Sequence, residues 1–220
     1  MRSRPLRTCP RATRWIVLLC LAAFALPGLA EDLPAPAKAA TDYPAVDNHT
    51  KEQVAIAAVP FDTAHDCRIF QVDYLKYQFM PIRIIVTNNG DRPISLRDAR
   101  IFFITANGDR IPAAEPEDVE RRVTPQYDRG AGIPVGPIRI HKTPKVSDTK
   151  IEADFDHWEY SALVVEPHTT HDGFLFYDMN GLGDTPLKNA KLVFRELKNA
   201  EGQQLFFFEI PFNNFLSAQH

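Results

Sequence analysis

The chain contains 220 residues, of which 45% are hydrophobic and 24% charged, and its 25 basic and 28 acidic side chains give a net charge of −3. A chain of this length can bury one hydrophobic core. The acidic balance argues against nucleic acid and anionic lipid surfaces as partners, because both repel a chain with more carboxylates than cations.

Residues 1–30 have the three parts of a secretory signal peptide. Five arginines and no acidic residue precede Trp15, and an apolar run then extends to Leu26. The small residues Gly28 and Ala30 stand where cleavage requires them. The apolar run is shorter than the roughly 20 residues of a membrane-spanning helix. We therefore expect cleavage after Ala30 and a periplasmic or extracellular protein without stable membrane insertion; the alternative is an uncleaved N-terminal anchor.

Cleavage changes both the charge and the cysteine content. The signal segment holds five of the 25 basic residues and none of the 28 acidic ones, so the mature chain has 20 against 28 and a net charge of −8. Cys9 and Cys20 are removed with it, and Cys20 follows two leucines inside the apolar run, which does not fit a lipidated cysteine. Cys67 remains without a partner for an internal disulfide, so the domain relies on its core.

The mature chain is predicted to begin with a linker and to continue as one domain. Residues 31–50 are rich in Pro and Ala without apolar periodicity, which predicts a flexible linker, and the domain then covers residues 51–216. Short apolar runs that are rich in β-branched and aromatic residues and bounded by turn residues predict strands. These runs cover residues 54–59, 82–88, 93–96, 99–105, 161–166, 174–179, 190–197 and 205–212.

The connections between these strands are predicted from their turn residues. Residues 69–77 fit either a strand or a short helix, and the polar run 168–173 predicts a turn. In the last strand, Phe206 is expected on the same face as Phe208, because successive side chains alternate between faces. Pro211 cannot donate a ladder hydrogen bond, which places it at a sheet edge or a strand end.

A long excursion over residues 115–155 interrupts the strand pattern. Residues 113–123 are charged and predict a short exposed helix, whereas residues 124–150 contain four Pro and three Gly. Loops of this length are uncommon in compact domains and are usually functional or mobile. We interpret the excursion as a partly irregular insertion that is either a partner-binding segment or simply a mobile loop.

Seven or eight short strands with at most a short helix predict an all-β fold, an antiparallel immunoglobulin-like β-sandwich. The chain resembles secreted bacterial immunoglobulin-like domains of uncharacterised function in three motifs. The motifs are Pro-Ile-x-Ile-x-Val-x-Asn-Asn-Gly-Asp-x-Pro-Ile (81–94), Val-x-Pro-x-x-Thr-x-x-Gly-Phe-Leu-Phe (165–176) and Leu-x-Phe-Phe-Glu-Ile-Pro (205–211). The resemblance covers residues 52–110 and 160–212. It implies the fold and a bacterial envelope setting, and it carries no catalytic residues.

One group of side chains could bind a metal ion. A His-x-x-His pair can place two imidazoles on one ion, with a carboxylate as a third ligand. The candidates are His168, His171 and Asp172, together with His157, Asp154 and Asp156 from the preceding segment. The pair lacks the helix and the glutamate base that make His-Glu-x-x-His specific. Solvated turn residues are the simpler interpretation, so we predict no metal site.

Cys67 is the second chemical candidate. His65 lies two residues before it, where a strand would place both side chains on one face, and Asp66 and Arg68 flank it. A reactive thiol needs a lowered pKa and a base held by a third group, and no residue in the sequence is identifiable as that third group. We therefore predict a semi-buried structural cysteine.

The sequence does not contain Gly-x-Ser-x-Gly, a common signature of a serine nucleophile. We assign no catalytic, metal-binding or cofactor-binding residue and expect no cofactor. The expected function is that of an exported, non-enzymatic binding or structural module of the cell envelope. Its partner would be an envelope or extracellular protein, contacted through loops or a sheet edge. The alternative is a small metal-dependent or thiol hydrolase that uses the His/Asp cluster at 154–172 or Cys67.

Overall fold

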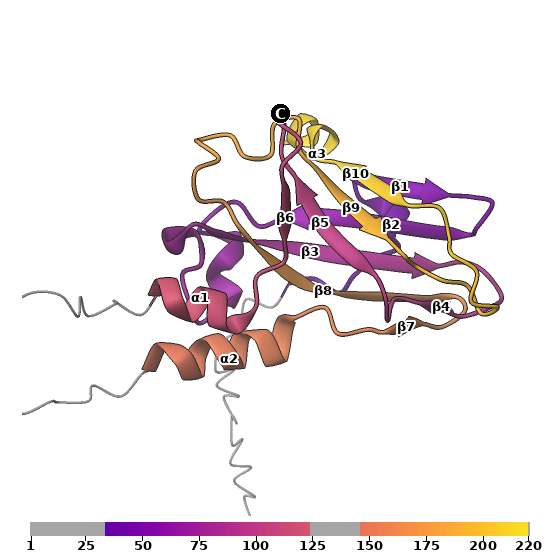
Figure 1. Cartoon of the computed structure of the whole chain (residues 1–220), viewed down its shortest axis with the longest axis horizontal. Helices are drawn as coiled ribbons and strands as arrows, with labels where there is room; N and C mark the ends of the chain where they lie inside the picture. The colour runs from indigo at the N-terminus through magenta and orange to yellow at the C-terminus, as the bar shows by residue number, and fades with distance from the viewer. Residues whose placement is uncertain (1–33, 124–145, 220) are drawn as a thin grey trace, which may run out of the picture. The chain divides into compact units, whose positions relative to one another are not determined.

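The computed structural model describes residues 34–123 and 146–219, and the predicted signal peptide lies outside these ranges (Figure 1). The described part is mostly antiparallel β structure with three short α-helices. Its strands are β1 (Val46–His49), β2 (Val54–Pro60), β3 (Phe79–Asn88), β4 (Ile94–Ser95), β5 (Arg100–Ile104), β6 (Arg110–Pro112), β7 (Val164–Val165), β8 (Thr169–Asp178), β9 (Lys191–Arg195) and β10 (Phe208–Pro211).

Three α-helices and three 3-10 turns complete the described part. They are α1 (Pro116–Val123), α2 (Val146–Trp158) and α3 (Asn213–Ala218), with η1 (Ala40–Asp42), η2 (Asp66–Ile69) and η3 (Leu75–Tyr77). None of these helices is long and apolar enough to cross a membrane.

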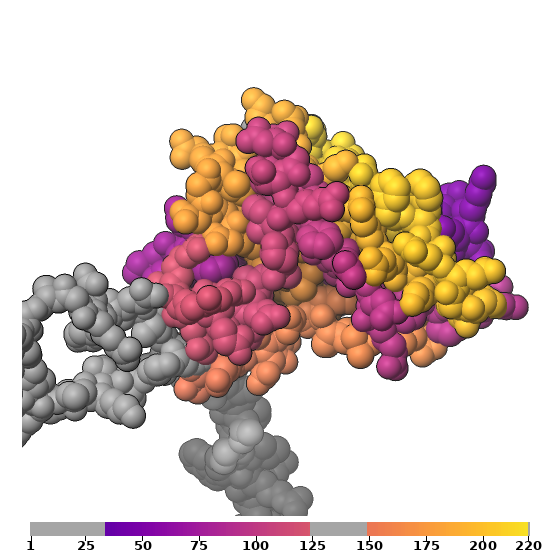
Figure 2. Space-filling view, viewed as in Figure 1, coloured from indigo at the N-terminus to yellow at the C-terminus, as the bar shows by residue number. Residues whose placement is uncertain are grey.

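The strands form two four-stranded sheets and one small two-stranded sheet. The sheet with the order β1-β2-β3-β8 is called the inner sheet, and the sheet with the order β10-β9-β5-β6 is called the outer sheet. β4 pairs with β7, and all pairings between these strands are antiparallel. In the space-filling view the solvent face of the outer sheet is turned toward the viewer, with β5 and β6 in magenta beside the yellow C-terminal part (Figure 2).

The main core lies between the two four-stranded sheets. Alternate residues of β3, including Ile82 and Ile84, point into it from the inner sheet, and Phe103, Phe194 and Phe208 enter it from the outer sheet. All five of these side chains are fully buried. Burying one such side chain contributes about 1.5–3 kcal/mol, so this shared core holds the two sheets together.

The inner sheet is also covered on its second face. At one end, Phe174 and Phe176 of β8 pack against α1, α2 and the segment of residues 61–77. At the other end, Ala55 and Ala57 of β2 pack against the N-terminal segment around Ala40. A strand buried on both faces has a continuous apolar sequence, which accounts for the composition of β2 and β3.

The prediction of a flexible linker over residues 31–50 is wrong for its second half. β1 pairs with β2 through residues 46–49, and Ala40 and Ala45 have no exposed surface. The Ala40 N–H donates a hydrogen bond of 2.8 Å to Thr87 Oγ1. Ala40 packs against Ala55 and Ala57 of β2, and side chains this small can fit together closely. Because alanine is only weakly hydrophobic, the sequence gives little indication of this contact.

The prediction of at most a short helix is also wrong, because the described residues form three short α-helices. Helix α2 has 13 residues and extends through the end of the predicted 115–155 excursion. Its Ile151 and Phe155, one helical turn apart, are buried against the inner sheet together with Val119 of α1. α1 itself confirms the helix predicted within residues 113–123. Residues 124–145 of the excursion lie outside the described ranges.

Each of the eight predicted strands overlaps a described strand, but several boundaries differ, and those of β8 and β10 change the interpretation. β8 begins at Thr169, so the predicted turn over residues 168–173 is largely strand, paired with the end of β3. β10 begins only at Phe208, and Phe206 before it is 65% exposed instead of sharing the buried face. Pro211 ends β10, which is an edge strand of the outer sheet, as predicted.

Tyr177 of β8 provides a test of how the core is packed. Its side chain is fully buried, and its hydroxyl has no hydrogen-bond partner in the described part of the chain. We expect Tyr177→Phe to raise the free energy of unfolding by about 1 kcal/mol, because it removes a buried unpaired hydroxyl. The Tyr74→Phe control removes the 3.1 Å hydrogen bond to Asp154. This change is expected to lower the free energy of unfolding by about 1 kcal/mol. Urea unfolding measures both, and equal destabilisation would contradict the prediction.

Candidate functional site

Asp154, one of the predicted metal-ligand candidates, is a structural anchor. Its carboxylate accepts hydrogen bonds from the Gln71 N–H at 2.9 Å, the Val72 N–H at 3.1 Å and the Tyr74 hydroxyl at 3.1 Å. Only 1% of the residue is exposed. Burial raises the pKa of Asp154, and the hydrogen bonds from Gln71, Tyr74 and Val72 oppose this rise. The side chain ties α2 to the segment that precedes η3.

Three of the other candidate ligands, Asp172, His168 and His157, have partners of their own. Asp172 forms an ion pair with Arg83 of β3, at 2.6 Å from Nη2 to Oδ2. His168 Nε2 lies 3.0 Å from Asp91 Oδ1 at the surface. Asp156 is exposed on α2, and the His157 ring contacts Trp158. Among the described residues, no group of three or more His, Cys, Asp or Glu side chains could hold a metal ion, so His168, His171 and Asp172 do not converge.

Cys67 lies in a protected environment. It is 6% exposed, and its thiol donates to the Phe61 carbonyl at 3.3 Å. Burial, followed by the nearby carboxylates of Asp66 and Asp73, raises the pKa of the Cys67 thiol to about 12. The His65 ring contacts the Arg68 guanidinium instead of the thiol, with Nε2 3.3 Å from Nη2. This environment disfavours the thiolate that a nucleophile needs.

A cleft lies beside α1, where the sequence offered no motif. This space, called here the α1 cleft, has a volume of about 690 Å³ and is open to solvent. Its lining comes from β6, the connection to α1, α1 itself and the ends of β3 and β8. Its lining residues are Phe79, Ile111, Pro112, Ala113, Ala114, Asp118, Arg121, Arg122 and Asp178.

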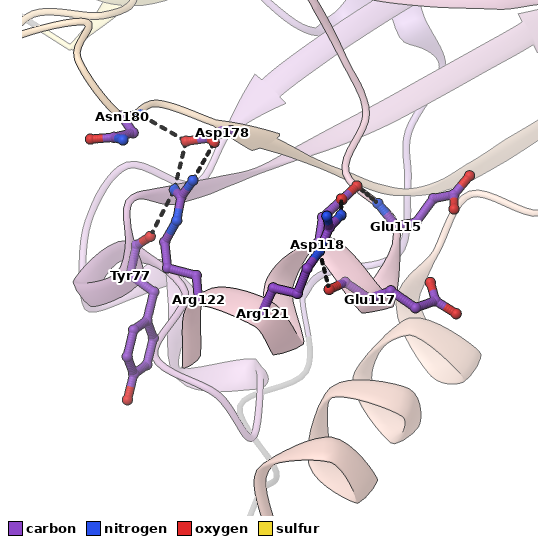
Figure 3. Close-up of polar contacts among 8 residues, drawn as sticks. All are labelled: Tyr77, Glu115, Glu117, Asp118, Arg121, Arg122, Asp178 and Asn180. Atoms are coloured by element: carbon purple, nitrogen blue, oxygen red, sulfur yellow. Dashed lines mark hydrogen bonds and ion pairs between the residues drawn. The ribbon is translucent and has the colours of Figure 1, made fainter. Parts of the chain in front are cut away.

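Arg122 is fixed in this cleft from three directions. Its Nη1 and Nη2 donate to the two carboxylate oxygens of Asp178 at 2.7 and 2.5 Å (Figure 3). Nη1 also donates to the Tyr77 carbonyl at 3.4 Å, and the guanidinium lies 4.6 Å from the centre of the Phe79 ring. The hydrogen bond from Arg122 holds the pKa of Asp178 below its usual value. A bidentate pair stacked on an aromatic ring holds the side chain in one orientation.

Arg121 is held less firmly at the rim of the cleft. It pairs with Asp118 on the same helix, and its Nε donates to the Glu117 carbonyl at 3.2 Å (Figure 3). The side chain of Arg121 is 70% exposed and that of Asp118 is 41% exposed. Exposed ion pairs contribute about 0–1 kcal/mol to stability. A ligand can therefore replace Asp118 as the partner of Arg121 at a small cost in free energy.

The cleft combines hydrogen-bond donors with an apolar wall. Contacts with described residues use three of the five N–H donors of Arg122, which leaves two for a ligand. Phe79, Ile111 and the two alanines supply apolar surface beside them. None of the nine described lining residues is a Ser, Thr, Cys, His or Lys. The arrangement can position a ligand through acceptor groups and apolar contacts, and its side chains offer no nucleophile of the Ser or Cys type.

Sequence reasoning missed this cleft because its members are distant in the chain. Arg122 and Asp178 are 56 residues apart, and the adjacent arginines resemble the last turn of any surface helix. Comparisons with protein-family models, with curated proteins and with solved structures find no match for this chain. The assignment of the candidate site therefore depends on the geometry of the α1 cleft.

Proposed function

We propose that this protein is an exported, non-enzymatic binding module with an immunoglobulin-like β-sandwich fold, and that it receives a partner protein of the cell envelope in the α1 cleft. The fold proposal is supported by two four-stranded antiparallel sheets that share one core. Export is supported by the composition of residues 1–30.

One observation carries the binding proposal: contacts within the protein hold Arg122 in one orientation. Asp178 and Phe79 hold the guanidinium in the lining of an open cleft, where part of its donor capacity is unused by the described residues. A side chain that is already ordered loses little conformational entropy on binding. A binding surface built in this way is preorganised.

The test uses the mature protein, from Glu31 onward, as immobilised bait for envelope extracts. Arg121→Glu reverses the charge at the rim, and Arg122→Lys keeps the charge but cannot make the bidentate contact with Asp178. We expect each change to reduce capture of the main partner by about tenfold, the effect of losing about 1.4 kcal/mol.

Lys38→Glu is the matched control. Lys38 is exposed in the N-terminal segment whose Ala37 and Ala40 pack on the second face of the inner sheet, and no described side chain pairs with its ammonium group. Thermal unfolding of all variants checks that the fold is retained. Equal capture by the wild type, both cleft variants and the control would refute binding in the α1 cleft.

A further inference from the structure

The solvent face of the outer sheet has an apolar centre. Phe102 of β5 lies directly opposite Val193 of β9 and Pro112 of β6, and Ile104 follows on the same face. Phe102 and Ile104 are only half-buried. They line a shallow hollow of about 160 Å³ on the face shown in Figure 2. The solvent-facing side of an antiparallel sheet normally carries polar residues, so this composition needs an explanation.

Basic side chains stand on both sides of the apolar centre. Arg100 of β5 lies directly opposite Arg195 of β9, and Ile104 lies between Arg110 of β6 and Lys191 of β9. Like charges directly opposite each other destabilise a sheet. Proteins depart from such local rules mainly at functional or strained sites.

The carboxylates of the described residues only partly neutralise these cations. Arg100 pairs with Glu196 at 3.2 Å, and Lys191 pairs with Glu209 at 2.7 Å. No described carboxylate lies within ion-pair distance of Arg110 or Arg195. The mature chain as a whole has a net charge of −8, so a surface with an excess of cations contrasts with the rest of the molecule.

We infer that this face of the outer sheet docks an acidic segment of a partner protein, an inference that goes beyond binding in the α1 cleft. Carboxylates of the partner would pair with Arg110 and Arg195, and an apolar side chain would cover Phe102. Arginine around a desolvated apolar centre is typical of protein interfaces. The acidic remainder of the chain opposes approach to an anionic bilayer, whose charge is spread over a wide plane. Charge complementarity therefore favours a protein segment over a lipid surface.

The key variant is Arg195→Glu, which separates docking from folding. The new carboxylate lies opposite Arg100 and replaces a like-charge pair by an opposite-charge pair. The change also removes the contact between the Arg195 guanidinium and the Phe207 ring, which lie 5.7 Å apart at the surface, so we expect a melting temperature close to that of the wild type. The probe is a fluorescent peptide of glutamates flanking a Leu-Phe pair, and its affinity is measured by anisotropy at low and high salt.

We expect Arg195→Glu and Arg110→Glu each to weaken binding of this peptide by about tenfold, while Lys38→Glu, with the same change in charge, leaves the affinity within about twofold. Arg121→Glu tests the cleft separately and is expected to leave peptide affinity unchanged. Loss of peptide binding in Arg121→Glu but not in Arg195→Glu would overturn the inference. Binding to phosphatidylglycerol vesicles in preference to the peptide would overturn it as well, as would self-association that Arg195→Glu abolishes without any peptide binding by the wild type.

Discussion

Gly173→Ala is expected to lower the free energy of unfolding of the mature domain by about 3 kcal/mol, the upper end of the usual cost of overpacking. A Cβ atom at this position would lie 2.5 Å from Tyr160 Cα and 2.8 Å from Tyr160 N. Both are main-chain atoms, so no side-chain rotation can relieve the clash. The Tyr160 N–H donates to the Phe174 carbonyl at 3.0 Å, which binds the chain after α2 to β8. Urea unfolding followed by tryptophan fluorescence measures the loss.

Gly108→Ala is the matched control for this change. Gly108 has a φ of +89°, and a Cβ atom there would meet no atom within 4 Å. Its replacement is therefore expected to cost only the backbone penalty of about 1 kcal/mol. If the two alanine variants unfold at the same urea concentration, the close approach of Tyr160 to Gly173 does not exist in solution.

Asp154→Ala is expected to lower the free energy of unfolding by about 3 kcal/mol, because it leaves buried hydrogen-bond donors without an acceptor. The Gln71 and Val72 N–H groups and the Tyr74 hydroxyl all lose their partner. The damage is expected to be local at first, with faster amide exchange at Gln71 and Val72 and increased protease sensitivity of α2. Urea unfolding and hydrogen exchange measured together distinguish this local opening from global destabilisation.

Asp156→Ala controls for the removal of an acidic residue from α2. Asp156 lies two residues after Asp154 and is exposed, so its replacement is expected to change the free energy of unfolding by less than about 0.5 kcal/mol. Asp154→Asn keeps one acceptor oxygen, so its free energy of unfolding is expected to lie between those of Asp154→Ala and Asp156→Ala. Equal stability of the two alanine variants would mean that the carboxylate of Asp154 does not hold α2.

Strands with strong side-chain signals were predictable, and elements held by long-range contacts were not. Residues 82–86 of β3 are apolar and β-branched except for Arg83, so local composition is enough to identify a strand. β1 has one apolar residue in four and depends on pairing with β2. In α2, Ile151 and Phe155 give a weak helical pattern after a Pro-rich stretch. The packing of Phe155 against Phe176, at 4.4 Å between ring centres, supplies the missing stabilisation.

The candidate site was less accessible to sequence reasoning than the fold. Side chains with obvious chemistry, such as Asp154 and Cys67, turn out to have structural environments. The α1 cleft instead depends on the pairing of Arg122 with Asp178, which only the tertiary fold brings together. A surface arginine has many potential partners in a sequence, and local periodicity does not distinguish among them.

The burial of Cys67 has a consequence for how the chain survives oxidation. In the exported protein that we propose, a free thiol can couple to another chain or progress to sulfenic and sulfinic acids, and both routes require an accessible thiolate. The folded domain excludes the Cys67 side chain from solvent, and its thiol has a pKa of about 12. The vulnerable interval is therefore the time before the segment of residues 61–77 packs onto β8. The packing of that part of the core therefore protects the thiol chemically as well as stabilising the fold.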